Sequence, residues 1–129
     1  MPLQRNVAQQ NAETEAKVRQ AAEMFASHPT RLAWLNAILL SHGLVPNSGI
    51  LARLSEVPEQ EGNLFSGVWL SQAEEFWEFE VVVSRESGEL LSTERFENTT
   101  NTVSVNQALR GRGKSFGRIA IEVLRGSSA

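Results

Sequence analysis

The sequence contains no cysteine, no aspartate and no tyrosine among its 129 residues. Without cysteine there is no disulfide, no zinc–thiolate site and no thiol nucleophile. Without aspartate, the Asp-based magnesium sites of phosphoryl transfer, the Asp of a Ser-His-Asp triad and aspartyl dyads are excluded. The two histidines, His28 and His42, fall at the ends of expected helices, where the helix dipole favours them. These residue types favour a non-catalytic protein with no cofactor and no metal over an enzyme.

Long apolar segments are absent as well. The most apolar stretch, Leu32–Leu40, is too short to span a bilayer and contains Asn36. The first six residues are not followed by the apolar core of a secretion signal. Absence of cysteine fits a reducing compartment. We therefore expect a cytoplasmic protein that does not associate with membranes.

The charges are distributed unevenly along the chain, and all 15 acidic residues are glutamate. Residues 56–97 carry eleven Glu and two Arg, a net charge of −9, whereas residues 1–55 carry +2 and residues 98–129 carry +4. A chain polarised in this way can self-associate, for example as a dimer, or bind a basic protein on one face and an acidic one on another. The alternative is that these regions neutralise each other within one fold.

The length fits one domain, with residues 1–11 as a flexible, polar lead-in and residues 12–126 as a single α+β domain. Helices are predicted over residues 11–27 and 31–42, the second with Thr30 as its cap and Gly43 at its end. A short third helix is predicted to begin after Asn47 or Ser48 and to end at Pro58, with its apolar side chains inward (Ile50, Leu51 and Leu54).

The second half of the chain changes to an alternating pattern that predicts strands at 64–70, 75–85, 90–97 and 103–109. A two-residue turn at Ser87-Gly88 would place Phe79 opposite Phe96, Glu80 opposite Arg95 and Glu94 opposite Val81. Residues 116–124 alternate partly like a strand but match a helical stripe at more positions, so we predict a C-terminal helix.

The predicted fold is α+β, with N-terminal helices packed on a mostly antiparallel four-stranded meander and a helix at the C-terminus. The order of the elements is similar to that of cystatin-like or nuclear-transport-factor-like cones. The segment at residues 57–62 is a polar loop and the one internal position that resembles a domain boundary.

The segment Ala108-Leu-Arg-Gly-Arg-Gly-Lys-Ser115 matches a relaxed phosphate-binding loop pattern. The chain that follows is too short for further parallel strands, and no Asp is present to hold magnesium. We interpret the segment as a Gly-rich basic turn, in which Arg110, Arg112 and Lys114 are candidates to contact an anion or an acidic partner.

The residues from His28 to Leu40, with the later run Ile50-Leu-Ala-Arg-Leu54, resemble the opening helices of winged-helix repressors of the arsenic-sensing kind. This resemblance implies DNA binding through a recognition helix that carries Ser, Thr and basic residues. The next residues of this chain are acidic and helix-breaking instead, and acidic residues repel phosphate. Nucleic acid is therefore not the expected partner.

The hairpin at residues 75–98 contains the remaining candidate site residues. Glu78 and Glu80 are expected on its solvent face, Phe76 on the same face as an anchor for a protein partner if exposed, and Glu94 as a polar contact on the inner face. We expect a protein-interaction module of the small bacterial inhibitor, immunity or adaptor type, which uses the acidic sheet. The alternatives are a cone that binds a small ligand with its Trp-bearing inner face, with or without enzymatic activity, and the DNA-binding protein above.

Overall fold

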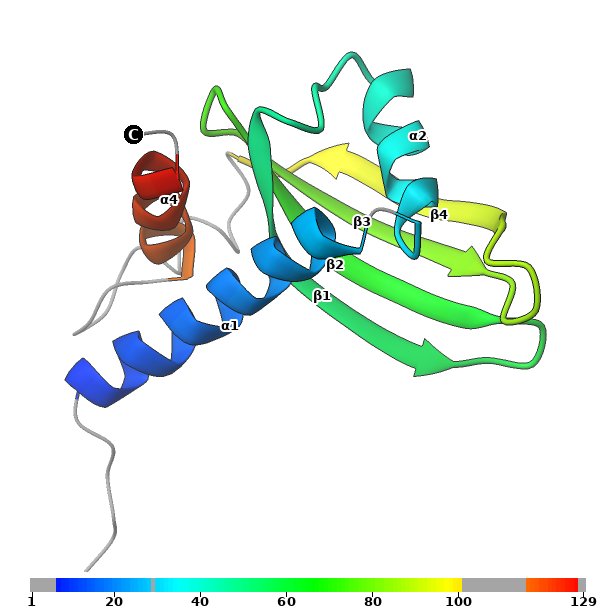
Figure 1. Cartoon of the computed structure of the whole chain (residues 1–129), viewed down its shortest axis with the longest axis horizontal. Helices are drawn as coiled ribbons and strands as arrows, with labels where there is room; N and C mark the ends of the chain where they lie inside the picture. Colours follow the sequence, from blue (N-terminus) through cyan, green and yellow to red (C-terminus); the bar gives the residue numbers. More distant parts are fainter. Residues whose placement is uncertain (1–6, 29, 101–115, 128–129) are drawn as a thin grey trace, which may run out of the picture.

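The computed structural model describes residues 7–28, 30–100 and 116–127. Four strands form one antiparallel sheet in the order β1-β2-β3-β4, and the α+β class predicted from the sequence is confirmed (Figure 1). The elements in chain order are α1 (Val7–Ser27), α2 (Ala33–Ser41), β1 (Gly49–Pro58), β2 (Asn63–Ser71), β3 (Phe76–Val83), β4 (Leu90–Asn98) and α4 (Phe116–Ser127).

The N-terminal helices begin at positions that differ from the prediction. Helix α1 starts at Val7, so residues 7–11, expected in the lead-in, are helical. Leu32 rather than Thr30 occupies the N-cap position of α2, which makes the predicted Thr30 cap wrong. Residues 30–32 instead form a turn, in which the Leu32 N–H donates to the His28 carbonyl at 3.3 Å.

The end of α2 is formed by Gly43, as predicted. Gly43 has a φ of 74°, a left-handed conformation that glycine adopts without steric cost. Its N–H donates to the Leu40 carbonyl at 3.1 Å, and the Leu44 N–H donates to the Leu39 carbonyl at 2.9 Å. These two bonds make a Schellman motif, which satisfies carbonyl groups that the helix leaves unpaired.

The predicted third helix is wrong, because those residues form strand β1. The strand pairs with β2 from Gly49 opposite Ser71 to Pro58 opposite Asn63. The first residues of β1 do not alternate between apolar and polar as a half-exposed strand does. Ile50, Leu51 and Ala52 are all buried, because both faces of the sheet are covered there. The second helix that the winged-helix resemblance requires is therefore a strand, and the expected strand at 103–109 lies outside the described residues.

The hairpin of β3 and β4 has the predicted register at its far end, where Phe79 faces Phe96 and Glu80 faces Arg95. Its loop is longer than the two residues expected. The Ser84 N–H donates to the Glu89 carbonyl at 2.8 Å, so the loop spans residues 85–88. Two register shifts in the hairpin compensate for the longer loop.

One of these shifts corrects the predicted position of Glu94. Val81 faces Thr93 rather than Glu94, because the register skips one residue of β4 between the Glu80 and Val81 pairs. Glu94 is exposed, so the prediction that it points to the inner face is wrong. The bulge removes a conflict that a regular ladder would have created, namely a carboxylate on an apolar face.

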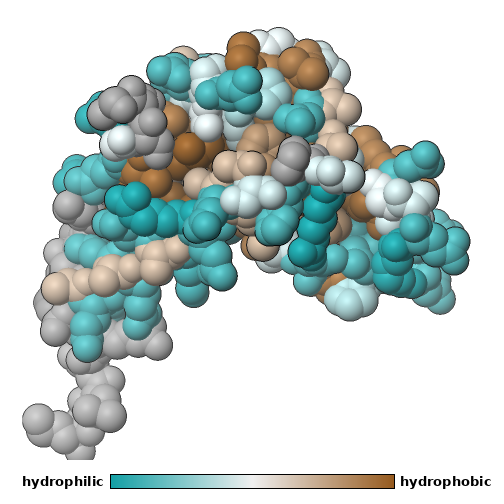
Figure 2. Space-filling model, viewed as in Figure 1, coloured by the Kyte–Doolittle hydropathy of each residue, from teal (hydrophilic) through white to brown (hydrophobic). Residues whose placement is uncertain are grey.

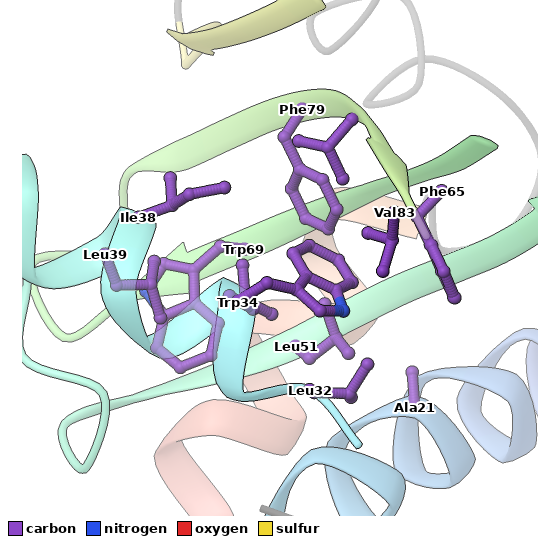
Figure 3. Packing of buried hydrophobic residues seen from close by; sticks show 12 residues of the cluster. Ala21, Leu32, Trp34, Ile38, Leu39, Leu51, Phe65, Trp69, Phe79 and Val83 are labelled. Carbon is purple, nitrogen blue, oxygen red and sulfur yellow. The ribbon is translucent and has the colours of Figure 1, made fainter. Parts of the chain in front are cut away.

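A hydrophobic core lies on each face of the sheet. On the first face, α2 and the C-terminal half of α1 cover an aromatic cluster, in which the Trp34 ring lies 5.1 Å from Phe65 and 6.0 Å from Phe79 (Figure 3). On the second face, α4 and Val18 of α1 cover the end of the sheet where β1 begins. The second core contains Ile50, Ala52, Val68, Leu70, Phe76, Ile119, Ala120, Val123 and Leu124.

Candidate protein-binding surface

Phe76 is a residue of the second core. Its side chain is only 4% exposed, and its ring lies 6.5 Å from the Phe116 ring of α4. The strand alternation placed it correctly on the same face as Glu78 and Glu80. Phe76 therefore does not meet the condition of exposure that a binding anchor requires, because α4 covers this end of the face. The approach of α4 is a tertiary contact, which the alternation within a strand does not reveal.

Glu78 and Glu80 lie farther along the same face, half-buried, where Arg95 partly neutralises them. The Arg95 guanidinium lies 3.4 Å from the Glu78 carboxylate and 2.6 Å from that of Glu97. The hydrogen bond to Glu97, and then the charges of Glu78, Glu97 and Glu80, raise the pKa of Arg95. The charges on this part of the sheet thus pair with one another. Their attraction for a charged partner protein is correspondingly weaker.

Of the other predicted site residues, the structure describes Glu94, which does not join this network. Glu94 is exposed on β4, where its carboxylate accepts a hydrogen bond from the Ser92 hydroxyl at 3.0 Å. Arg110, Arg112 and Lys114 lie outside the described residues. Among the described residues, the sequence candidates therefore do not form one site.

A different surface is built at the end of the sheet where the β1–β2 and β3–β4 turns lie side by side (Figure 1). Arg85 joins these turns. One of its guanidinium nitrogens donates to the carbonyls of Glu59 at 2.6 Å and Gly62 at 2.9 Å, and the other donates to the Gln60 carbonyl at 3.1 Å. A fourth bond reaches the Asn63 side-chain oxygen at 3.3 Å. Arg85 thereby holds the two turns in one fixed arrangement.

The joined turns present four exposed carboxylates, from Glu59, Glu61, Glu86 and Glu89. None of the four forms an ion pair with another described residue. The nearby Arg85 uses its hydrogen bonds on carbonyl groups instead. In the space-filling view, hydrophilic residues cover much of this end (Figure 2). The end of the sheet therefore carries a net negative charge that the described part of the fold leaves uncompensated.

Apolar side chains accompany these carboxylates. Val57 is 51% exposed, Leu91 is 50% exposed and Leu90 is 37% exposed. An ideal Cβ built on Gly62 would lie 3.4 Å from Leu91 Cδ1, so Leu91 reaches across to the first turn. We call this surface the sheet tip and define it by Val57, Glu59, Glu61, Arg85, Glu86, Glu89, Leu90 and Leu91.

The residues of the sheet tip were not singled out from the sequence, although a signal was present. Each turn places two glutamates next to exposed aliphatic residues, in Val57-Pro-Glu-Gln-Glu61 and in Glu86-Ser-Gly-Glu-Leu-Leu91. The first of these segments had been considered a possible domain boundary. It is a tight turn within the sheet, in which the Glu59 N–H donates to the Gly62 carbonyl at 2.7 Å.

The histidines occupy the predicted helix ends. His42 is the C-cap of α2, with Nδ1 3.0 Å from the Ile38 carbonyl, and its ring lies 4.3 Å from that of Phe96. His28 directly follows α1. Among the residues that the structure describes, no group of three His or Glu side chains is arranged to hold a metal ion.

Two clefts in the described part of the molecule lie along α1. One has a volume of about 540 Å³ and the other about 620 Å³. Their linings come from α1, from β1 and the loop before it, from α4 and from Asn36 of α2, and include neither the tryptophans nor Glu94. The inner face proposed for ligand binding is instead occupied by the packed aromatic cluster of the first core (Figure 3).

The chain matches no protein-family model, no curated protein and no solved structure. The similarity to cystatin-like or nuclear-transport-factor-like cones is therefore not confirmed. In the described segments, no helix combines the length and the hydropathy that crossing a membrane requires.

Proposed function

We propose that this chain is a non-catalytic protein-interaction module that binds a basic protein surface through its sheet tip. The observation that carries the proposal is the combination, on two joined turns, of four carboxylates unpaired within the described structure with exposed Val57, Leu90 and Leu91. Exposed apolar side chains beside charged ones are typical of protein interaction sites. Small inhibitors, immunity proteins and adaptors act through preformed surfaces of this kind.

The fixed arrangement of the turns supports binding. A surface loop that must become ordered on association reduces the affinity by its lost conformational entropy. The four hydrogen bonds of Arg85 join both turns before any partner arrives. The sheet tip is thus a preorganised surface rather than two independent loops.

The charge of the sheet tip specifies the chemistry of the partner. Complementary charges accelerate association and select among partners, and this effect weakens as salt screens the charges. Glu78 and Glu97 contact Arg95, whereas the carboxylates of the sheet tip lack such a partner among the described residues. A partner surface with Lys or Arg around an apolar centre would complement it.

The proposal is tested with immobilised protein in native lysate, using a sheet-tip variant that carries Glu61→Lys, Glu86→Lys and Glu89→Lys. The matched control carries Glu15→Lys and Glu23→Lys on the exposed face of α1. We expect one basic protein to be retained by the wild type and by the control, and to be lost from the sheet-tip variant. With that protein purified, the three reversals should weaken binding at least tenfold, because each removes an attraction and adds a repulsion.

Circular dichroism establishes that all three proteins are folded before the comparison. Retention of the same protein by the sheet-tip variant at unchanged affinity would reject the sheet tip as the binding surface. Retention of no specific protein by the wild type would reject the interaction function itself.

A further inference from the structure

The cleft of about 540 Å³ beside α1 has a charge of the opposite sign to the net charge of the chain. Among the residues that the structure describes, the charged lining residues are Lys17 of α1 and Arg53 of β1, and none of the described lining residues is a carboxylate. The chain as a whole has a net charge of −3. The described lining of this cleft is therefore positively charged, whereas the chain as a whole is negatively charged.

Lys17 and Arg53 also differ from most of the other basic side chains. Arg19, Arg31, Arg95 and Arg125 each form an ion pair with Glu, and Arg85 binds carbonyl groups. Neither Lys17 nor Arg53 pairs with a carboxylate in the described residues. Their charges are available to an anion that enters the cleft.

Arg53 is held in place by an aromatic ring. Its guanidinium carbon lies 4.5 Å from the centre of the Phe116 ring, at the start of α4. This cation–π contact limits the positions of the long side chain, which forms no ion pair with a described carboxylate. It also places an aromatic surface directly beside the cation, within the lining of the same cleft.

The remaining lining combines apolar and polar groups. Val18, Ala21, Met24 and Leu54 provide the apolar part, and Thr14 and Gln20 provide hydrogen-bonding groups. The volume is within the range of clefts that hold small molecules. We infer that this cleft binds a small amphipathic anion, in which a carboxylate, sulfonate or phosphate group meets Lys17 and Arg53 while an apolar body packs on Phe116 and Met24.

This site is separate from the sheet tip, so the two proposals stand or fall independently. The probe is 2-naphthoate, and its neutral analogue 2-naphthamide serves as the ligand control. Backbone amide NMR signals are followed during titration of the whole chain. For a probe of this size we expect a Kd of about 1 mM, an affinity that ligand-efficiency limits allow.

We expect saturable shifts around Lys17, Arg53 and Phe116 with the anion, and at least tenfold weaker binding of the amide. Lys17→Gln and Arg53→Gln should each weaken naphthoate binding about twofold to fivefold, as expected for one exposed charge contact. Arg19→Gln and Arg31→Gln, which remove paired cations outside the cleft, should leave it unchanged. Equal affinity for acid and amide, shifts elsewhere on the surface, or equal effects of all four variants would overturn the inference.

Discussion

Gly67 is a position in the sheet where there is no room for a Cβ atom. A Cβ at this residue would clash with the Arg53 carbonyl oxygen of the neighbouring strand and would lie 2.7 Å from Phe79 Cζ. Phe79 is 1% exposed and packs over this glycine from β3. The absence of a side chain at Gly67 is what lets the aromatic ring lie flat against the sheet in the first core.

Gly67→Ala is therefore expected to destabilise the protein by about 1–3 kcal/mol, the usual cost of overpacking a core. The measurement is urea unfolding followed by circular dichroism. Gly126→Ala is the matched control, because a Cβ there meets nothing within 4 Å. In α4 that change should leave stability unchanged or raise it slightly. Equal effects of the two substitutions would contradict the steric explanation.

At the scale of elements, a bidentate ion pair connects α4 to the sheet. Arg125 Nε and Nη2 lie 2.6 Å and 2.9 Å from the two carboxylate oxygens of Glu74 in the β2–β3 turn. Glu74 has a φ of 62°, a conformation that is uncommon for a residue with a side chain. The hydrogen bond from Arg125 lowers the pKa of the Glu74 carboxyl; burial opposes this shift, and the charge of Arg125 adds a smaller lowering.

This lowered pKa predicts the direction of a pH effect. Because the folded chain holds the Glu74 carboxylate more strongly than the unfolded chain does, the stabilisation is present at neutral pH. It is lost as the pH falls through the lowered pKa. NMR titration of the Glu74 carboxyl should give a midpoint below that of an ordinary glutamate, and Arg125→Gln should raise it towards the ordinary value. Arg19→Gln, whose partner is Glu15 on α1, should leave this midpoint unchanged.

At the scale of the whole molecule, the two cores share α1, β1, β2 and β3. Helix α1 contributes Ala21 to the first core and Val18 to the second, and β1 contributes Leu51 to the first and Ile50 to the second. Loss of packing in one core therefore loosens elements that the other core requires. This arrangement predicts that the chain unfolds as one cooperative unit rather than as two.

Leu35→Ala in the first core and Ile119→Ala in the second test this cooperativity. Both residues are almost fully buried, so each substitution should reduce the free energy of unfolding by about 2–5 kcal/mol. All three tryptophans belong to or pack against the first core, so their fluorescence reports on it. We expect Ile119→Ala to shift the fluorescence midpoint as much as the circular dichroism midpoint. A shift in circular dichroism alone would show that the second core unfolds separately.

Local patterns were sufficient for most elements. Alternation over Trp77, Phe79, Val81 and Val83 predicts a strand with one buried face, because one face packs and the other meets solvent. Gly43 predicts the end of α2, because glycine readily adopts the left-handed conformation found after helices. The stripe at residues 116–124 predicts α4. Each of these signals comes from residues within the element itself.

Other features depended on neighbours far away in the sequence. Three buried residues at the start of β1 have no strand period, because α4 covers one face there and the first core covers the other. The same covering by α4 buries Phe76. The sheet tip is formed by Arg85 bridging to residues 59–63, and no local pattern reports a contact between two separate turns.

The sequence by itself therefore determined the α+β class, the hairpin with Phe79 opposite Phe96, and the scarcity of catalytic residue types. These follow from composition and from periodicities that each element carries in its own residues. Only the tertiary structure decided that residues 49–58 form a strand, that Phe76 is buried and that Glu94 is exposed by a bulge. Those outcomes depend on which elements pack together. Where a strand is buried on both faces, its residues no longer alternate between apolar and polar, and this alternation is the pattern from which a strand is predicted.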